Sequence, residues 1–172
     1  MNEVIKALLE RRSIKDYTNE QVTDEQLEQI IKCGLYAPNG MGAQAPVFIA
    51  VRDKQTRDEL SKLNADVMGA SADPFYNAPC VICVLADSQR STAVEDASLA
   101  IGNMCLAAHS LGLGSCWIHR CRQVFESPQG KALLEKWGVK QDLIGVGFCI
   151  LGHTNQNKQP AERKENRVFY ID

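Results

Sequence analysis

The order of helical and strand-like segments predicts an α+β fold in one globular domain. Two helical segments precede any strand, and the later strands are short, β-branched and interleaved with helices. A doubly wound sheet would instead start from alternating strands and helices. The 172 residues (1–172) contain neither internal repeats nor a linker, and a chain of this length buries enough apolar surface to need no disulfide or structural metal.

The first forty residues predict two helices. The first spans Asn2–Arg11, with Asn2 as its N-cap. Its apolar stripe consists of Ile5, Leu8 and Leu9. Thr23 followed three residues later by Gln26 is a capping-box pattern, which starts a second helix that ends before Pro38.

Two short strands follow, at Val47–Val51 and Pro79–Ala86. Both runs are too short and too rich in β-branched residues for helices. A polar segment near Thr56–Leu63 has helical spacing, so we expect a helix between the two strands.

The second half of the chain predicts two helices and two strands. Small and apolar residues recur at helical spacing over Thr92–Leu111, which predicts a largely enclosed helix, and Gly112 suits the residue of positive φ that ends it. A strand over Ser115–Ile118 follows. The pair Ser127-Pro128 begins a helix that ends at Trp137-Gly138, and Leu143–Leu151 forms the last strand.

The C-terminal tail, residues 153–172, is polar and has no period until a β-prone tetrapeptide, Val168–Ile171. Such a tail has no core of its own. Its apolar end needs a surface on which to dock, and a partner subunit is as plausible as the parent domain.

The overall charge argues against nucleic-acid and membrane partners. The 19 Lys and Arg residues nearly balance 21 Asp and Glu residues, for a net charge of −2. The longest apolar stretch is about half of the roughly 20 residues that cross a bilayer, and charges stand near the N-terminus where a signal peptide would be apolar. We therefore expect a cytoplasmic protein, whose seven cysteines are reduced and fill the core.

Several familiar motifs are incomplete in this sequence. Cys80 and Cys83 form a CxxC pattern, but an offset of three along a strand directs them to opposite faces, so we expect no metal site there. The glycine pairs at Gly112 and Gly145 lack the third glycine of a dinucleotide fingerprint. We interpret the first pair as a helix end and the second as close packing against a bulky neighbour.

Two basic groups and one loop are candidate binding elements. Arg11, Arg12, Ser13 and Lys15 place three cations and a hydroxyl just past a helix end, where they can bind a phosphate or form a solvated helix terminus. The loop Ala37–Gln44 can present backbone N–H groups to a flat polar ligand. The second basic group lies in the tail. It consists of Arg163, Lys164 and Arg167, and a solvated terminus explains it equally well.

Taken in order, four segments resemble the nitroreductase family of FMN-dependent oxidoreductases. They are RRSIKDY, APNGMGAQAP, LGLGSCWIHR and PAERKENRVFYI. The resemblance spans almost the whole chain. It implies a three-layer α+β fold with a central, mainly antiparallel sheet flanked by helices. It also implies an intertwined homodimer with two FMN sites at the subunit interface, on which the tail docks.

The resemblance further assigns cofactor-binding residues. Arg11, Arg12 and Ser13 would hold the FMN phosphate and ribityl chain, and Lys15 would stabilise negative charge at the pyrimidine edge of the flavin. The basic pair of the tail would reach the phosphate. That pair is Arg163 and Lys164.

Two further groups would contact the flavin ring. The first is the loop that meets the flavin on the partner side, through Asn39, Gly40 and Gln44. The second is the strand end whose backbone N–H groups would approach flavin N5, formed by Trp117, Ile118, His119 and Arg120.

The implied activity is hydride transfer from NADH or NADPH to flavin N5, followed by ping-pong reduction of a nitroaromatic compound, a quinone or a similar acceptor. The flavin would carry the chemistry without a protein acid or base. Three alternatives remain: other flavin chemistry such as dehalogenation or desaturation, a flavin-binding redox sensor, and a protein-interaction domain with solvated basic clusters.

Overall fold

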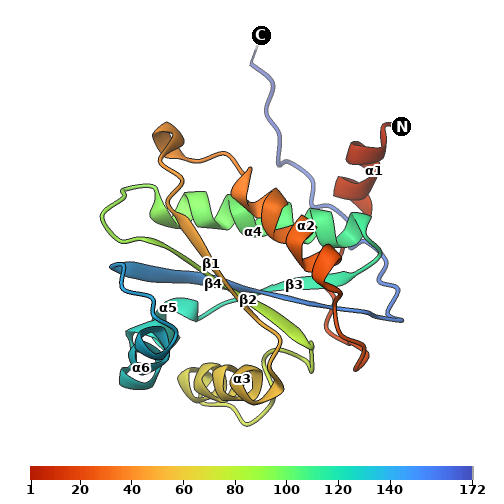
Figure 1. Cartoon of the computed structure of the whole chain (residues 1–172). Coiled ribbons are helices and arrows are strands. Elements are labelled where there is room, and N and C mark those ends of the chain that lie inside the picture. The colour runs from red at the N-terminus through yellow and green to blue at the C-terminus, as the bar shows by residue number, and fades with distance from the viewer. Residues whose placement is uncertain (172) are drawn as a thin grey trace.

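A four-stranded antiparallel sheet separates two layers of helices (Figure 1). The computed structural model describes residues 1–171. The strands are β1 (Pro46–Val51), β2 (Cys80–Asp87), β3 (Gly114–Ile118) and β4 (Leu143–Gly152), in the spatial order β1-β2-β4-β3. The predicted α+β, three-layer architecture is confirmed. Because β3 is an edge strand, one side of it is open to other segments.

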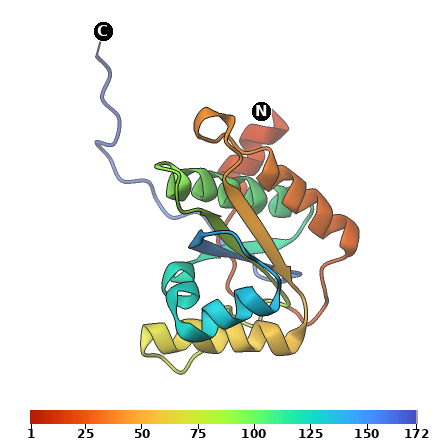
Figure 2. The same cartoon turned by 60° about the vertical axis from the view of Figure 1, so that its left-hand side comes forward.

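Helices cover both faces of the sheet (Figures 1 and 2). On one face lie α1 (Glu3–Glu10), α2 (Asp24–Leu35) and α4 (Ala93–Ser110). On the other face lie α3 (Lys54–Met68), α5 (Cys121–Glu126) and α6 (Pro128–Lys136). A short 3-10 turn, η1 (Gly40–Gly42), precedes β1.

The alternation of side chains along β2 divides the core into two layers. Val81, Cys83 and Leu85 join the cluster beneath α3, α5 and α6, whereas Cys80 and its alternate neighbours pack beneath α2 and α4. The prediction that Cys80 and Cys83 lie on opposite faces is therefore confirmed. Burial raises the pKa of the Cys80 thiol to about 12, which keeps it protonated and inert at neutral pH.

Local signals in the sequence identify most helix ends correctly. The Asn2 side chain accepts the Val4 N–H at 2.8 Å, and Thr23 forms its reciprocal capping box with Gln26. Gly112 has a φ of +75°, as expected for the residue after α4. These signals succeed because each involves residues within a few positions of one another.

Two helices differ from their predicted extents. The helix expected near 56–63 spans Lys54–Met68, because the Asp53 side chain caps it at Thr56 and Gly69 adopts a left-handed conformation at its end. The six-residue helix α5 was not predicted at all, since one and a half turns are too short to show a helical period.

The predicted β-structure of Val168–Ile171 is wrong for the single chain. These four residues pair with no strand of the described chain, and their side chains are 65–93% exposed. The apolar stripe of α1 is likewise exposed, and Cys33 is exposed instead of filling the core. Helix α4 is less enclosed than expected, because Val94 and Leu99 are nearly half exposed. Within residues 1–171, no helix combines the length and apolarity needed to cross a membrane.

Candidate functional site

The segment after α1 runs along the open edge of β3. Ser13 forms an isolated parallel bridge with Ser115, and the Ile14 N–H donates to the Ser115 carbonyl at 2.9 Å. Alternate side chains of this segment point into two different cavities. Ser13 and Lys15 line one cavity, whereas Arg12 and Ile14 line another. The basic cluster that is continuous in the sequence is thus divided between two sites.

The first site, which we call the strand-edge cavity, has a volume of about 320 Å³. It gathers six of the residues expected from the sequence. They are Ser13, Lys15, Trp117, Ile118, His119 and Arg120. The remaining walls come from Cys116, Met68, Pro74 and Tyr76. The Lys15 Nζ lies 5.2 Å from the centre of the Tyr76 ring, so a cation and a flat aromatic group face each other there.

The backbone of β3 offers hydrogen-bonding groups to the strand-edge cavity. The Ser115 carbonyl points away from β4, because it accepts from Ile14. In an antiparallel strand the N–H and C=O of one residue point the same way, and this direction alternates along the strand. Trp117 therefore also directs its N–H and C=O to the open edge, beside the cavity that it lines.

The chain turns sharply where β3 ends. Arg120 has a φ of +74°, a left-handed conformation that is uncommon for a residue with a side chain. The preceding peptide is held by Asn64 on α3, whose side-chain amide donates to the His119 carbonyl at 2.9 Å. Asn64 is completely buried whereas His119 is exposed, so this hydrogen bond is partly sheltered from water. Arg120 is thus fixed at the cavity wall by its neighbours.

Close packing also fixes the strand before the turn. A Cβ atom on Gly147 of β4 would lie 2.0 Å from the Trp117 Nε1, so only glycine leaves room for the indole. The predicted packing of this glycine pair against a bulky neighbour is confirmed.

The second site, which we call the arginine cavity, has a volume of about 280 Å³. Arg12 donates from Nη1 to the carbonyls of Leu9 and Arg11 at 2.6 and 2.8 Å, and its buried Nε has no partner within residues 1–171. The start of the tail forms the opposite wall. There Lys158 donates to the Ser13 carbonyl at 2.8 Å, and Gln156 accepts the Lys15 N–H at 3.1 Å.

Lys158 and Gln156 were missed by the sequence analysis. Both belong to the polar tail, where no period or motif distinguishes one residue from the next. Only the path of the tail beside residues 13–18 brings them to the site, through hydrogen bonds such as that from the Thr18 N–H to the His153 carbonyl.

None of the predicted loop residues lines either cavity. The Asn39 Oδ1 accepts the Gln44 N–H at 2.8 Å, which closes the loop on itself. The Gly40 N–H donates at 2.9 Å to Asp96, a buried carboxylate on α4. A single chain therefore does not bring Asn39, Gly40 and Gln44 to the strand-edge cavity.

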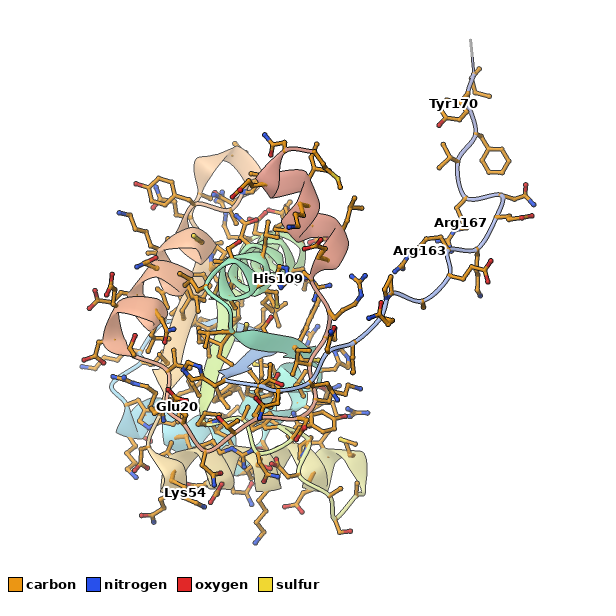
Figure 3. All side chains as sticks on the ribbon, turned by 90° about the vertical axis from the view of Figure 1, so that its right-hand side faces the viewer. Glu20, Lys54, His109, Arg163, Arg167 and Tyr170 are labelled. Carbon is orange, nitrogen blue, oxygen red and sulfur yellow. The ribbon has the colours of Figure 1, made fainter. Side chains whose placement is uncertain are left out.

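The predicted tail pair is also separate. Figure 3 shows Arg163 and Arg167 on a segment that leaves the body of the protein, and both Arg163 and Lys164 are exposed. Lys158 at the base of this segment contacts Ser13, and a span of five or six residues covers at most about 20 Å. Arg163 and Lys164 therefore lie no more than about 20 Å from Lys158, which lines the arginine cavity.

Buried thiols lie behind the bridge between Ser13 and Ser115. The Cys105 and Cys149 sulfur atoms are 3.9 Å apart. The hydrogen bond with Cys149 lowers the pKa of Cys105, and Ser115 and the charge of Arg11 act in the same direction, although burial opposes them. Burial raises the pKa of Cys116, which lines the strand-edge cavity, so this thiol is protonated at neutral pH.

A larger cavity of about 490 Å³ lies elsewhere, between the start of α3 and the segment before β2. Its basic residues are already paired: Arg52 with Asp24 at 2.6 Å, Lys54 with Asp58, and Arg57 with Asp58 and Asp73. These pairs anchor the surrounding loops. The two cavities beside β3 contain the residues expected from the sequence, so we take them as the candidate site.

The model of the nitroreductase family matches residues 8–159. The chain belongs to the nitroreductase family. The matched region contains β3, both cavities and the loop at Asn39. It ends at the base of the tail, just after Lys158. The four segments that resemble this family in sequence are thus parts of a member of it.

Individual relatives support the assignment. The chain is 32% identical to an FMN reductase [NAD(P)H] of Bacillus subtilis over 97% of its own length and 70% of that protein. Its structure matches an FMN-bound nitroreductase of Bacteroides fragilis with a TM-score of 0.92 and 27% identity, each chain being covered completely. An FMN-bound nitroreductase of Desulfitobacterium hafniense matches with a TM-score of 0.90 and 28% identity, again over both complete chains.

Proposed function

We propose that this nitroreductase-family protein is an FMN-dependent oxidoreductase that takes electrons from NADH or NADPH and reduces a second substrate. Nitroaromatic compounds, quinones or similar acceptors are the substrates we propose. The observation that carries the proposal is the strand-edge cavity, where six residues expected to contact FMN come together from two distant parts of the chain. Family membership and the FMN-bound relatives support it.

The residues around the two cavities fit FMN. Its ring system is flat and its edge carries hydrogen-bonding atoms, and the strand-edge cavity combines the Trp117 backbone edge with Lys15 and the Tyr76 ring. Its phosphate is an anion, and the neighbouring arginine cavity holds an Arg12 nitrogen without a partner, together with Lys158. Bound FMN would supply the redox chemistry, accepting hydride at N5 from NAD(P)H and passing two electrons to the acceptor in a ping-pong cycle.

The chain's own residues would bind the cofactor and stabilise charge. Lys15 would place a positive charge beside the ring, favouring the electron-rich reduced form. The Trp117 backbone and the fixed turn at Arg120 would hold the ring's orientation. The lining residues of the strand-edge cavity include no carboxylate, and burial raises the pKa of the Cys116 thiol, which makes it a weaker proton donor. We therefore propose that protons for the product come from water.

We further propose a homodimer, in which the loop of one protomer contacts the cofactor held by the other. Asn39, Gly40 and Gln44 do not line the strand-edge cavity of their own chain. Large apolar side chains are exposed on α1, on α4 and at the end of the tail, including Leu9, Leu99 and Phe169. Exposed apolar surface of this extent is typical of a protein interface. The expected mass in solution by light scattering is twice that of the chain, and a monomer would contradict this proposal.

Purification tests the activity directly. The protein should be yellow or become so with added FMN, lose its flavin absorbance on anaerobic addition of NADH or NADPH, and regain it with a nitroarene or a quinone. A colourless protein that does not bind added FMN would refute the proposal. Reduction by NAD(P)H without reoxidation by either acceptor class would favour a redox-sensing role or other flavin chemistry.

Two substitutions test the placement of the cofactor. We expect Lys15→Gln and Lys158→Gln each to raise the Kd for FMN about tenfold, equivalent to about 1.4 kcal/mol, because each removes a positive charge beside the cofactor. Lys131→Gln, an exposed lysine on α6, is the matched control and should leave the Kd unchanged. Unchanged FMN binding in both site variants would show that the cofactor lies elsewhere.

A further inference from the structure

The charged side chains that line the strand-edge cavity are all positive. Its lining residues include two permanent cations, Lys15 and Arg120, and one histidine, His119, but no Asp or Glu. Asp73, the residue before Pro74, does not line the cavity, and its carboxylate is already bound by Arg57 and Ser61 on α3. A ligand in this cavity therefore meets positive charge that the protein itself does not neutralise.

Arg120 is held in place at an energetic cost. A left-handed conformation is energetically unfavourable at a residue with a side chain and persists only where the surroundings enforce it. Here the buried Asn64 holds the preceding carbonyl, and α5 begins directly after Arg120. Backbone strain of this kind is concentrated at functional sites, which suggests a functional role for Arg120.

The guanidinium of Arg120 is available to a ligand. Within residues 1–171 it forms neither an ion pair nor a hydrogen bond, whereas Arg122, two residues later, pairs with Glu126 at 2.9 Å. Lys15 has a neighbour in the Tyr76 ring. Of the two cationic side chains that line this cavity, Arg120 is therefore the one without a protein partner in the described chain.

The wall from residues 68–76 is apolar and aromatic. Met68 and Pro74 can cover the face of a flat substrate. Tyr76 lies beside Lys15, which we assign to the cofactor. A guanidinium binds a planar carboxylate through two parallel hydrogen bonds, which a lysine ammonium does not reproduce. The cavity thus combines an apolar surface for an aromatic ring with a lining arginine, Arg120, whose guanidinium has no partner within residues 1–171.

Resting on the function proposed above, we propose that Arg120 selects second substrates that are both aromatic and anionic, with a carboxylate or similar group. An aromatic acceptor without charge would pack against the same apolar wall but would leave the guanidinium without a partner. The Arg120 side chain therefore provides the preference for the anionic acceptor.

A matched pair of acceptors tests this selection on the FMN-loaded protein. The probes are 4-nitrobenzoate and its methyl ester, which differ chiefly in charge. Both Kd, by titration calorimetry, and kcat/KM per bound flavin are measured for each probe. We expect the wild-type protein to favour the acid, and Arg120→Gln to lower the acid-to-ester ratio about tenfold in both measurements, mainly through KM.

Two further variants separate local recognition from general charge. Arg120→Lys should retain part of the preference for the acid over the ester, because it keeps the positive charge but loses the two parallel hydrogen bonds of the guanidinium. Arg122→Gln should retain all of it, because that cation already pairs with Glu126. An unchanged ratio in Arg120→Gln, or an equal fall in Arg122→Gln, would overturn the inference.

The two proposals fail in different ways. Wild-type protein that NAD(P)H does not reduce would contradict the proposed function. The ratio of the two Kd values is measured without turnover, so it still decides whether Arg120 recognises the carboxylate.

Discussion

Gly145→Ala should destabilise the protein strongly, because the added methyl group meets backbone atoms that cannot move aside. A Cβ at this position of β4 would lie 2.5 Å from the Cys121 carbonyl oxygen, 2.6 Å from its carbon and 2.9 Å from the Arg122 nitrogen. Overpacking of a core costs typically 1–3 kcal/mol, and contact with backbone places this substitution at about 3 kcal/mol. For a domain of this size that lowers Tm by roughly 6–12 °C.

The same contact links stability to the candidate site. Cys121 begins α5 directly after Arg120, so a displaced α5 also moves the wall of the strand-edge cavity. The assay is thermal unfolding by far-UV circular dichroism at one fixed protein concentration, with and without FMN, because a dimer's Tm depends on concentration. We expect the variant to lose part of the stabilisation that FMN provides.

Gly102→Ala is the matched control. Gly102 lies on an exposed position of α4, and within the single chain an added Cβ has no neighbour within 4 Å. Alanine is favoured over glycine in a helix by roughly 0.5–1 kcal/mol, so this variant should melt slightly higher than the wild type. If Gly145→Ala melted within a degree of the wild type, the packing between β4 and α5 described above would be wrong.

Three further predictions concern the loops and thiols. Asn64→Leu should leave the His119 carbonyl unpaired and cost about 1–3 kcal/mol in urea unfolding, with weaker FMN binding as a second readout; unchanged values would exclude its positioning role. Burial alone would raise the pKa of Asp73, but hydrogen bonds, above all from Arg57, lower it below the ordinary value of 3.8. The stability that Asp73 provides relative to Asp73→Asn should therefore be complete above about pH 5 and decline as the pH falls through that lowered pKa; a difference that does not change between pH 7 and pH 3 would contradict this. Native protein should react rapidly with a thiol reagent at Cys33 alone, and with all seven cysteines after denaturation; rapid reaction of a second thiol would show that the core is more open than described.

Much of the site was accessible from the sequence because its motifs are continuous. Trp117 and Arg120 lie three positions apart at a strand end, and the structure places both at one cavity with Lys15. The motif that begins at Arg11 was recognised as a unit, but its side chains do not all line the same cavity. Arg12 turns into the arginine cavity, because neighbouring side chains of an extended segment point in opposite directions.

The apolar stripe of α1 shows the limit of periodicity. Its spacing correctly predicts a helix, yet Leu8 and Leu9 are about 60% exposed in the described chain. A period shows that one face is apolar but does not show what covers that face. The same holds for the end of the tail, where β-prone residues have no strand beside them in the chain itself.

By itself, the sequence determined the fold class, most helix ends, the opposite directions of Cys80 and Cys83, and the membership of the family. These features depend on residues a few positions apart or on continuous motifs. Only the tertiary structure decided that Lys158 contacts Ser13, 145 positions away, and that Tyr76 faces Lys15. Such contacts depend on the order of strands in the sheet and on the path of the tail, which no local pattern encodes.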